Sequence, residues 1–129
     1  MSDFSIQKKI YYHDTDCGGV VYYANYLKYL EEARTEFLLL RGIELPKLAE
    51  RDLLFVVGRV EIDYKAPARY QDKIAISARV EETRLSAVRF YQEVSRDGLL
   101  LVTARTILVC VGGNFKPKKL PEEIKLRLE

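Results

Sequence analysis

Two aspartates stand one residue apart in the segment HDTDCGGVVYYANYLKYLEEAR, residues 13–34. Asp14 and Asp16 precede two glycines, and a periodicity typical of a helix begins a few residues later. The first N–H groups of a helix lack acceptors within the helix and carry the positive end of its dipole. Such amides can polarise a carbonyl group and stabilise the oxyanion that forms under attack. A neighbouring carboxylate can then attack the carbonyl carbon or activate a water molecule.

A thioester is the substrate that best suits so small a set of groups. Its leaving thiolate has a pKa near that of cysteine, about 8.5, so it departs without strong help from a general acid. An amide would need a proton donor, which this segment does not obviously contain. The residues alone leave open which of the two carboxylates, Asp14 or Asp16, would be catalytic.

Two other interpretations of the same segment need no thioester chemistry. Aspartate and glycine are common turn residues and aspartate is a good N-cap, so a purely structural turn is the most frequent reason for such a pattern. A calcium loop would use Asp14, Asp16 and Gly19 at its first, third and sixth positions. Its fifth and twelfth positions are Gly18 and Asn25, which supply no carboxylate. Calcium binding is therefore disfavoured.

A cysteine nucleophile is the remaining chemical alternative. Cys17 lies near the predicted helix start, where the thiol pKa can be lowered, and His13 is the only histidine available as its base. A turn residue at Cys17 and a strand end at His13 are the simpler interpretations. No histidine and cysteine cluster supports a metal site, so the sequence predicts neither a metal nor a cofactor.

The hydrophobic pattern predicts the elements that must position this segment. Apolar residues recur at spacings of three and four over residues 22–41 and predict a helix, at Tyr26, Leu30, Ala33, Phe37 and Leu40. Gly42 is a suitable stop for that helix. Apolar runs predict strands over residues 4–12, 54–65, 72–82, 86–95 and 99–111, and a short helix or a loop over residues 45–52. The expected class is α+β, with one helix covering one face of an antiparallel five-stranded sheet.

Length and composition limit the kind of protein. The 129 residues predict a single domain over 1–129, and the formal net charge of +2 argues against nucleic acid as a partner. No stretch is long and apolar enough to be a transmembrane segment, and the N-terminus lacks the apolar core of a secretion signal. We therefore expect a cytoplasmic protein whose two cysteines, Cys17 and Cys110, are reduced.

The segment HDTDCGGVVYYANYLKYLEEART resembles the start of the hotdog-fold acyl-CoA thioesterases of the 4-hydroxybenzoyl-CoA thioesterase family. It looks closest to the branch associated with the bacterial Tol-Pal system. The shared features are an Asp-x-Asp-x-x-Gly loop, a Val-Val-Tyr run, an Asn-Tyr pair and a Glu-x-Ala-Arg motif. Weaker matches in IDYKAPARYQD, LVTARTILVCV and LPEEI extend the resemblance over nearly the whole chain.

This resemblance implies a hotdog fold, in which a five-stranded antiparallel sheet wraps around the helix of residues 22–41. It implies a homodimer with two active sites at the subunit interface, often assembled further into a homotetramer, and an acyl-CoA or acyl-carrier thioester as substrate. It assigns the catalytic carboxylate to Asp16 and polarisation of the thioester carbonyl to the backbone N–H of Tyr23. The other residues of the motif would bind the substrate: Asp14, Gly19, Val20, Tyr22, Asn25 and Glu31.

Tyr23 departs from the Tol-Pal-associated branch, which commonly has histidine at this position, and matches the branch that acts on aromatic acyl groups. A backbone role survives the change, because every residue except proline has an N–H. The acyl group, whether short aliphatic, long-chain or aromatic, therefore stays open.

The coenzyme A end of the substrate needs cations for its phosphates. The family often places basic residues where the third strand turns into the fourth, so the resemblance points to Arg84, Ser86 and Arg89, with Lys65 and Arg69 as further candidates. Each of them is equally well explained as a solvated surface residue.

Two hypotheses from other classes accompany the thioesterase prediction. A non-catalytic module that binds acyl-CoA or an acyl carrier, acting as a scaffold, would show no turnover. A hotdog dehydratase generally needs a histidine in its site, and here only His13 is available.

Overall fold

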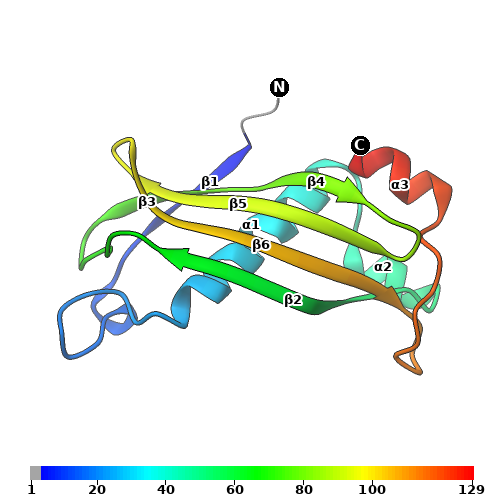
Figure 1. Ribbon diagram of the computed structural model, residues 1–129, viewed down its shortest axis with the longest axis horizontal. Helices are drawn as coiled ribbons and strands as arrows, with labels where there is room; N and C mark the ends of the chain where they lie inside the picture. Colours follow the sequence, from blue (N-terminus) through cyan, green and yellow to red (C-terminus); the bar gives the residue numbers. More distant parts are fainter. Residues whose placement is uncertain (1–3) are drawn as a thin grey trace.

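The computed structural model describes residues 4–129. A curved antiparallel sheet crosses the molecule, and one long helix lies against one of its faces (Figure 1). The strands run in the order β1-β3-β5-β6-β2, and β4 pairs with β5 beside this path. The strands are β1 (Ser5–Lys9), β2 (Leu54–Tyr64), β3 (Lys73–Ser77), β4 (Arg79–Thr83), β5 (Ala87–Arg96) and β6 (Leu99–Val111).

Helix α1 (Asn25–Leu40) forms because its apolar residues fall on one stripe. Tyr26, Leu30, Ala33 and Phe37 are buried against the sheet, as the sequence predicts, whereas Leu40 is exposed. The helix ends in a Schellman motif, the hydrogen-bonded reversal in which a residue with positive φ follows the last turn. That residue is Gly42, at φ +75°.

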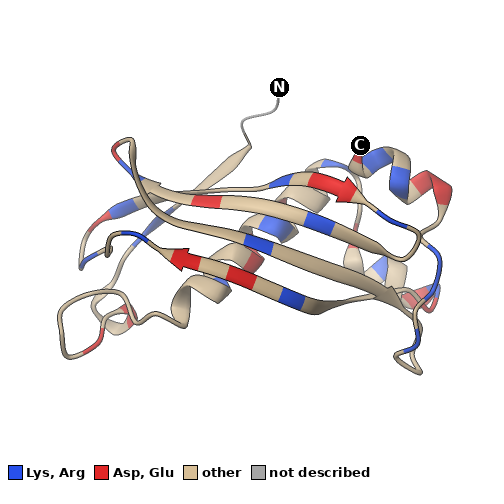
Figure 2. Ribbon diagram, viewed as in Figure 1, with Lys and Arg blue, Asp and Glu red and all other residues tan. Residues whose placement is uncertain are grey.

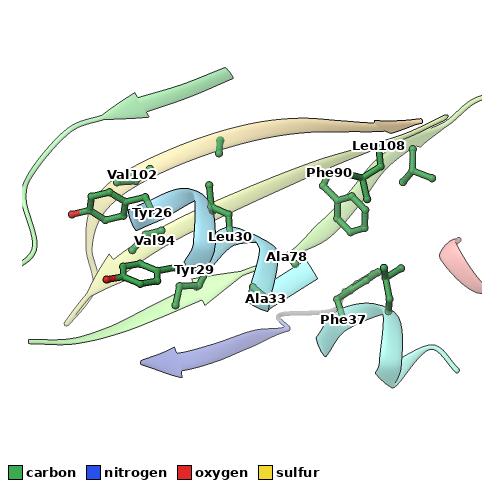
Figure 3. Packing of buried hydrophobic residues seen from close by; sticks show 14 of the residues in the cluster. Tyr26, Tyr29, Leu30, Ala33, Phe37, Ala78, Phe90, Val94, Val102 and Leu108 are labelled. Atoms are coloured by element: carbon green, nitrogen blue, oxygen red, sulfur yellow. The ribbon is translucent and has the colours of Figure 1, made fainter. Parts of the chain in front are cut away.

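The core lies between α1 and the concave face of the sheet. Figure 3 shows aromatic and aliphatic side chains from α1 meeting those of β5 and β6. The rings of Phe37 and Phe90 meet edge to face with centroids 5.6 Å apart. Acidic and basic residues are spread over the strands (Figure 2), including an ion pair between Arg59 and Glu61.

The α+β class and the antiparallel sheet are confirmed, but the sheet has six strands rather than five. The predicted strand over residues 72–82 is split at Ala78, whose N–H donates to Phe4 instead of to β5. Beside the break, the Ser77 hydroxyl accepts the Glu93 N–H and the Gln92 side chain donates to the Ser77 carbonyl. Side chains thus take over the hydrogen bonds of the interrupted ladder.

Two element boundaries and one additional helix also differ from the prediction. The helix begins at Asn25 rather than at residue 22, and the first strand ends at Lys9, before a 3-10 turn over Tyr12–Asp14. The ambiguous segment 45–52 contains a helix, α2 (Leu45–Glu50). The tail forms a further helix, α3 (Glu122–Leu128), which the sequence reading missed.

Strand β2 carries a bulge at Gly58, where its register against β6 shifts between Val57 and Arg59. The bulge puts Val57 and Val60 on the same face of the strand, toward α1, although their positions differ by an odd number, three. A strict alternation would put them on opposite faces. A Cβ at Gly58 would stand 2.8 Å from a methyl carbon of Val109, which explains the glycine at this position.

No helix within residues 4–129 combines the length and the apolar character that crossing a membrane requires.

Candidate active site

Asp14 closes the loop between β1 and α1. Its carboxylate is buried, 7% exposed for the residue, and accepts the Tyr11 N–H at 2.8 Å. Its carbonyl accepts the Tyr22 N–H and the Asn25 side-chain amide, both at 2.9 Å. Burial raises the pKa of Tyr29, and the adjacent Asp14 carboxylate raises it further, so the Tyr29 hydroxyl stays protonated beside it. The hydrogen bonds of Asp14 and Asn25 therefore hold the loop on the helix.

Asp16 lies at the exposed tip of the same loop. Its backbone is fixed, since its N–H donates to Val20 and its carbonyl accepts the Gly19 N–H. One carboxylate oxygen, Oδ1, accepts the Gly18 N–H at 2.7 Å. Within residues 4–129 the other oxygen has no hydrogen-bond partner, so it is available to water or a ligand. Gly19 permits this tight turn with φ at +80°.

The turn that leads into α1 supplies free amides. The Asn25 N–H donates to Tyr22, but the Tyr23 N–H has no acceptor in the part of the chain that the structure describes. The Tyr23 carbonyl accepts the Tyr64 hydroxyl at 2.9 Å, which ties this turn to the end of β2. The Tyr23 N–H shares its peptide unit with the Tyr22 carbonyl, which accepts the Asn25 N–H, so this amide is held in place and is free to donate.

The Asp16 charge lies close to this aromatic turn. The pKa of Tyr22 is raised, mainly by the neighbouring Tyr23 side chain and least by the negative charge of Asp16. The Tyr22 and Tyr23 rings lie 4.9 Å apart between centroids. A carboxylate and an unpaired amide therefore belong to one loop-helix junction.

A cavity of about 290 Å³ opens beside the Tyr23 turn. It is mainly apolar and is lined by Val20, Val21, Tyr23, Tyr26, Tyr64, Lys65, Ala66 and Pro67. Five of these residues were not predicted to bind substrate, namely Val21, Tyr26, Tyr64, Ala66 and Pro67. Tyr26 was predicted only as part of the apolar stripe of the helix, and Val21 only as part of the Val-Val-Tyr run. Tyr64, Ala66 and Pro67 were predicted only as part of the weakly matching segment IDYKAPARYQD. Asp16 does not line this cavity.

The structure brings only part of the predicted set together. The loop and helix start hold Asp14, Asp16, Gly19, Val20, Tyr22, Tyr23 and Asn25, and Lys65 lines the adjoining cavity. Glu31 lies instead in another cavity, between α1 and β2, and accepts a hydrogen bond from Thr35. Arg34, the arginine of the Glu-x-Ala-Arg motif, donates to Gln92 and Thr106 and forms no ion pair with Glu31.

Among the other predicted coenzyme A residues, Arg69 forms a β-bridge with Val20 of the aspartate loop, whereas Arg84, Ser86 and Arg89 lie away from this junction within one chain. Arg84 and Ser86 stand in the turn between β4 and β5, at the opposite end of the sheet from the aspartate loop (Figure 1). Arg84 pairs with Glu82 at 3.3 Å, and Arg89 on β5 lies 3.2 Å from Glu81. One chain therefore does not bring these cations to Asp16.

The alternative sites receive no support from the geometry. Within residues 4–129, no group of three or more histidine, cysteine, aspartate or glutamate side chains is arranged to hold a metal ion. His13 stacks on Tyr11, and its ring is not hydrogen-bonded to Cys17 in the described chain. Cys17 is exposed and Cys110 is buried, and both are free thiols.

Comparison with known proteins gives the family. Residues 11–128 match the model of the thioesterase-like superfamily. This chain belongs to the thioesterase-like superfamily. It is 40% identical over 124 residues to a protein of Haemophilus influenzae named acyl-CoA thioesterase YbgC, covering 95% of this chain and 91% of that protein.

Solved structures of thioesterase-like proteins have the same fold. A probable thioesterase from Bartonella henselae has a TM-score of 0.88 and 32% identity, and the match covers 93% of this chain and 100% of that one. A 4-hydroxybenzoyl-CoA thioesterase variant in complex with 4-hydroxybenzoyl-CoA has a TM-score of 0.90 and 20% identity, covering 98% of this chain and 99% of that one. The latter shows similarity of fold alone. The predicted thioesterase family and hotdog fold are thus confirmed.

Proposed function

We propose that this chain hydrolyses acyl-CoA thioesters, with Asp16 as the catalytic carboxylate and the Tyr23 N–H as the oxyanion donor. The observation that carries the proposal is the junction of loop and helix, where an exposed carboxylate oxygen and an unpaired backbone amide occur within eight residues of sequence, 16–23. The names of its relatives, acyl-CoA thioesterases among them, support the same reaction.

The groups account for each step of the reaction. As a general base, Asp16 accepts a proton from water while the water oxygen attacks the thioester carbon. As a nucleophile, Asp16 forms an anhydride that water then hydrolyses. In both routes the negative oxygen accepts the Tyr23 N–H, the carbon–sulfur bond breaks, and the thiolate of coenzyme A leaves and takes up a proton. The proposed chemistry involves no cofactor beyond the coenzyme A of the substrate.

A homodimer with shared sites is part of this proposal. Along its 11 residues, β2 pairs only with β6 within the described chain, and Val57 and Val60 are exposed beside its open edge. A second β2 running antiparallel would cover this edge. Such pairing would bring the turn that holds Arg84 and Ser86 toward the aspartate loop of the partner. The homotetramer, the Tol-Pal association and the cytoplasmic location stay predictions.

The test is release of free thiol from a panel of aliphatic and aromatic acyl-CoAs. Asp16→Asn keeps the shape of the side chain and removes its charge, so we expect kcat to fall by about 100-fold or more. Asp97→Asn, in the exposed hairpin turn between β5 and β6, is the matched control and should keep full activity.

Full turnover by Asp16→Asn would show that the assigned mechanism is wrong. Binding of acyl-CoA without any thiol release by the wild-type protein would favour the scaffold hypothesis. Alkene formation from hydroxyacyl thioesters would favour the dehydratase hypothesis.

A further inference from the structure

A buried guanidinium lies at the base of a second cavity, away from the aspartate loop. Arg34 projects from α1 toward the sheet and is 8% exposed. One nitrogen, Nη1, donates to the Gln92 amide oxygen at 3.1 Å and to the Thr106 hydroxyl at 3.5 Å. Gln92 and Thr106 are themselves almost fully buried, so the side chain is held in one position.

No carboxylate neutralises this cation within residues 4–129. None of the ion pairs formed by the described residues includes Arg34, and both of its hydrogen-bond partners are neutral. Burial lowers the pKa of Arg34, and the charge of Glu31 opposes this effect without a direct contact. A buried charge without a counter-charge is costly in free energy, so the Arg34 guanidinium lacks its counter-ion in a single chain.

The cavity around Arg34 is open to a partner. It measures about 540 Å³ and lies between α1 and the edge strand β2. A second cavity of about 120 Å³ continues it and shares Glu31, Arg34 and Val57. We call the two together the edge groove. Its rim carries exposed apolar side chains, with Leu27 at 45%, Val57 at 52% and Val60 at 36% exposure.

A second copy of this chain is the occupant that the groove fits. In a two-fold interface the same surface serves both sides, so each residue of the groove meets groove residues of the partner. The surface is self-complementary, since it has apolar side chains, a buried cation and a carboxylate that lacks a cation. That carboxylate is Glu31, which accepts only the Thr35 hydroxyl, whereas Glu32 in the same groove already pairs with Lys8 at 3.5 Å.

From this charge pattern we infer that Arg34 binds Glu31 of the partner subunit, and that the two symmetric ion pairs hold the dimer along α1 and β2. The inference rests on the dimer that forms part of the proposed function, and it assigns the residues that join the two copies. The free side of the Arg34 guanidinium would donate to the partner's Glu31, completing a charge-assisted contact between two largely desolvated groups.

Sedimentation of the full chain over a concentration series tests this contact. Glu31 is exposed in the single chain, so Glu31→Gln should fold normally, as its circular dichroism melt would verify. We expect it to raise the dissociation constant of the dimer by about 30-fold or more. Glu32→Gln is the matched control from the same groove and should change that constant by about twofold at most.

A charge exchange gives a second, independent readout. Glu31→Lys and Arg34→Glu should each sediment as monomers, because each puts like charges together at both contacts. Their mixture should form heterodimers, in which both contacts again join opposite charges. If Arg34→Glu does not fold, Glu31→Lys alone must still abolish the dimer.

Two results would overturn the inference: a dimer whose dissociation constant is unchanged in Glu31→Gln and Glu31→Lys, or a wild-type chain that stays monomeric at all concentrations. The thioesterase proposal fails separately. If the wild-type dimer released no thiol but Glu31→Lys still dissociated it, the proposed reaction would be refuted and the inferred contact would stand.

Discussion

At the residue scale, the two aspartates of the loop have different roles. Asp14 is buried, with its carboxylate Oδ2 and its carbonyl hydrogen-bonded within the chain, whereas the carboxylate of Asp16 lies at the exposed tip of the loop. The sequence could not separate them, because both precede the same glycines. The separation depends on the 3-10 turn over Tyr12–Asp14, which turns the first carboxylate inward. Its pattern in the sequence looks like the end of a strand.

Asp14→Ala should therefore destabilise the protein rather than act on the reaction itself. It removes the acceptor of the Tyr11 N–H and the packing of a buried side chain, so we expect the free energy of unfolding to fall by about 1–3 kcal/mol. Urea denaturation followed by circular dichroism measures this loss. Asp16→Asn serves as the comparison and should change stability by less than about 0.5 kcal/mol. Equal stability losses in the two variants would contradict this division of roles.

At the scale of elements, periodicity predicted the helix and the strands but not their interruptions. The bulge at Gly58 and the break at Ala78 follow from contacts with distant strands, at Val109 and at Phe4. Such contacts leave no local signal beyond a glycine and an alanine in apolar runs. The late start of α1 at Asn25 has the same kind of cause, since Tyr22 and Tyr23 are held by Asp14 and Tyr64.

Gly58→Ala tests the bulge. The added methyl group would meet Val109 at 2.8 Å, so we expect a loss of about 1–3 kcal/mol in the free energy of unfolding. Arg59→Ala, at the next and exposed position, should lose about 0.5 kcal/mol or less. The two variants are compared by their urea denaturation midpoints, provided that the free energy of unfolding depends on urea concentration with the same slope in both. A neutral Gly58→Ala would mean that β2 can shift away from β6 at no cost.

At the scale of the whole molecule, one chain brings to the proposed site only part of the set of cations predicted for the phosphates of coenzyme A, with Lys65 lining the adjoining cavity and Arg69 bridged to Val20. The resemblance named Arg84, Ser86 and Arg89 for this role, yet the first two lie at the far end of the sheet from Asp16 and Arg89 is paired with Glu81. The sequence alone does not show whether a residue acts in the site of its own chain or in that of a partner subunit. We therefore propose that the remaining basic residues join the site across a subunit interface.

A mixing experiment tests that assembly. Arg84→Met should raise KM for acyl-CoA by about tenfold, with a smaller effect on kcat, because a charged contact to phosphate is lost. Mixing it with inactive Asp16→Asn should give heterodimers that contain one intact site, combining Asp16 of one chain with the partner's Arg84. KM in the mixture should then approach the wild-type value. A mixture that keeps the KM of Arg84→Met would show that Arg84 does not act across the interface.

The contrast between the two thiols has a practical consequence. Cys17 is exposed beside Asp16, while Cys110 is buried in β6, so a disulfide reagent added to the folded protein should react with a single equivalent per chain. Any colorimetric measurement of liberated coenzyme A must subtract that stoichiometric burst. The rate of this burst also reports whether the loop is occupied, because a slowly hydrolysed substrate bound over the loop would shield Cys17 from the reagent.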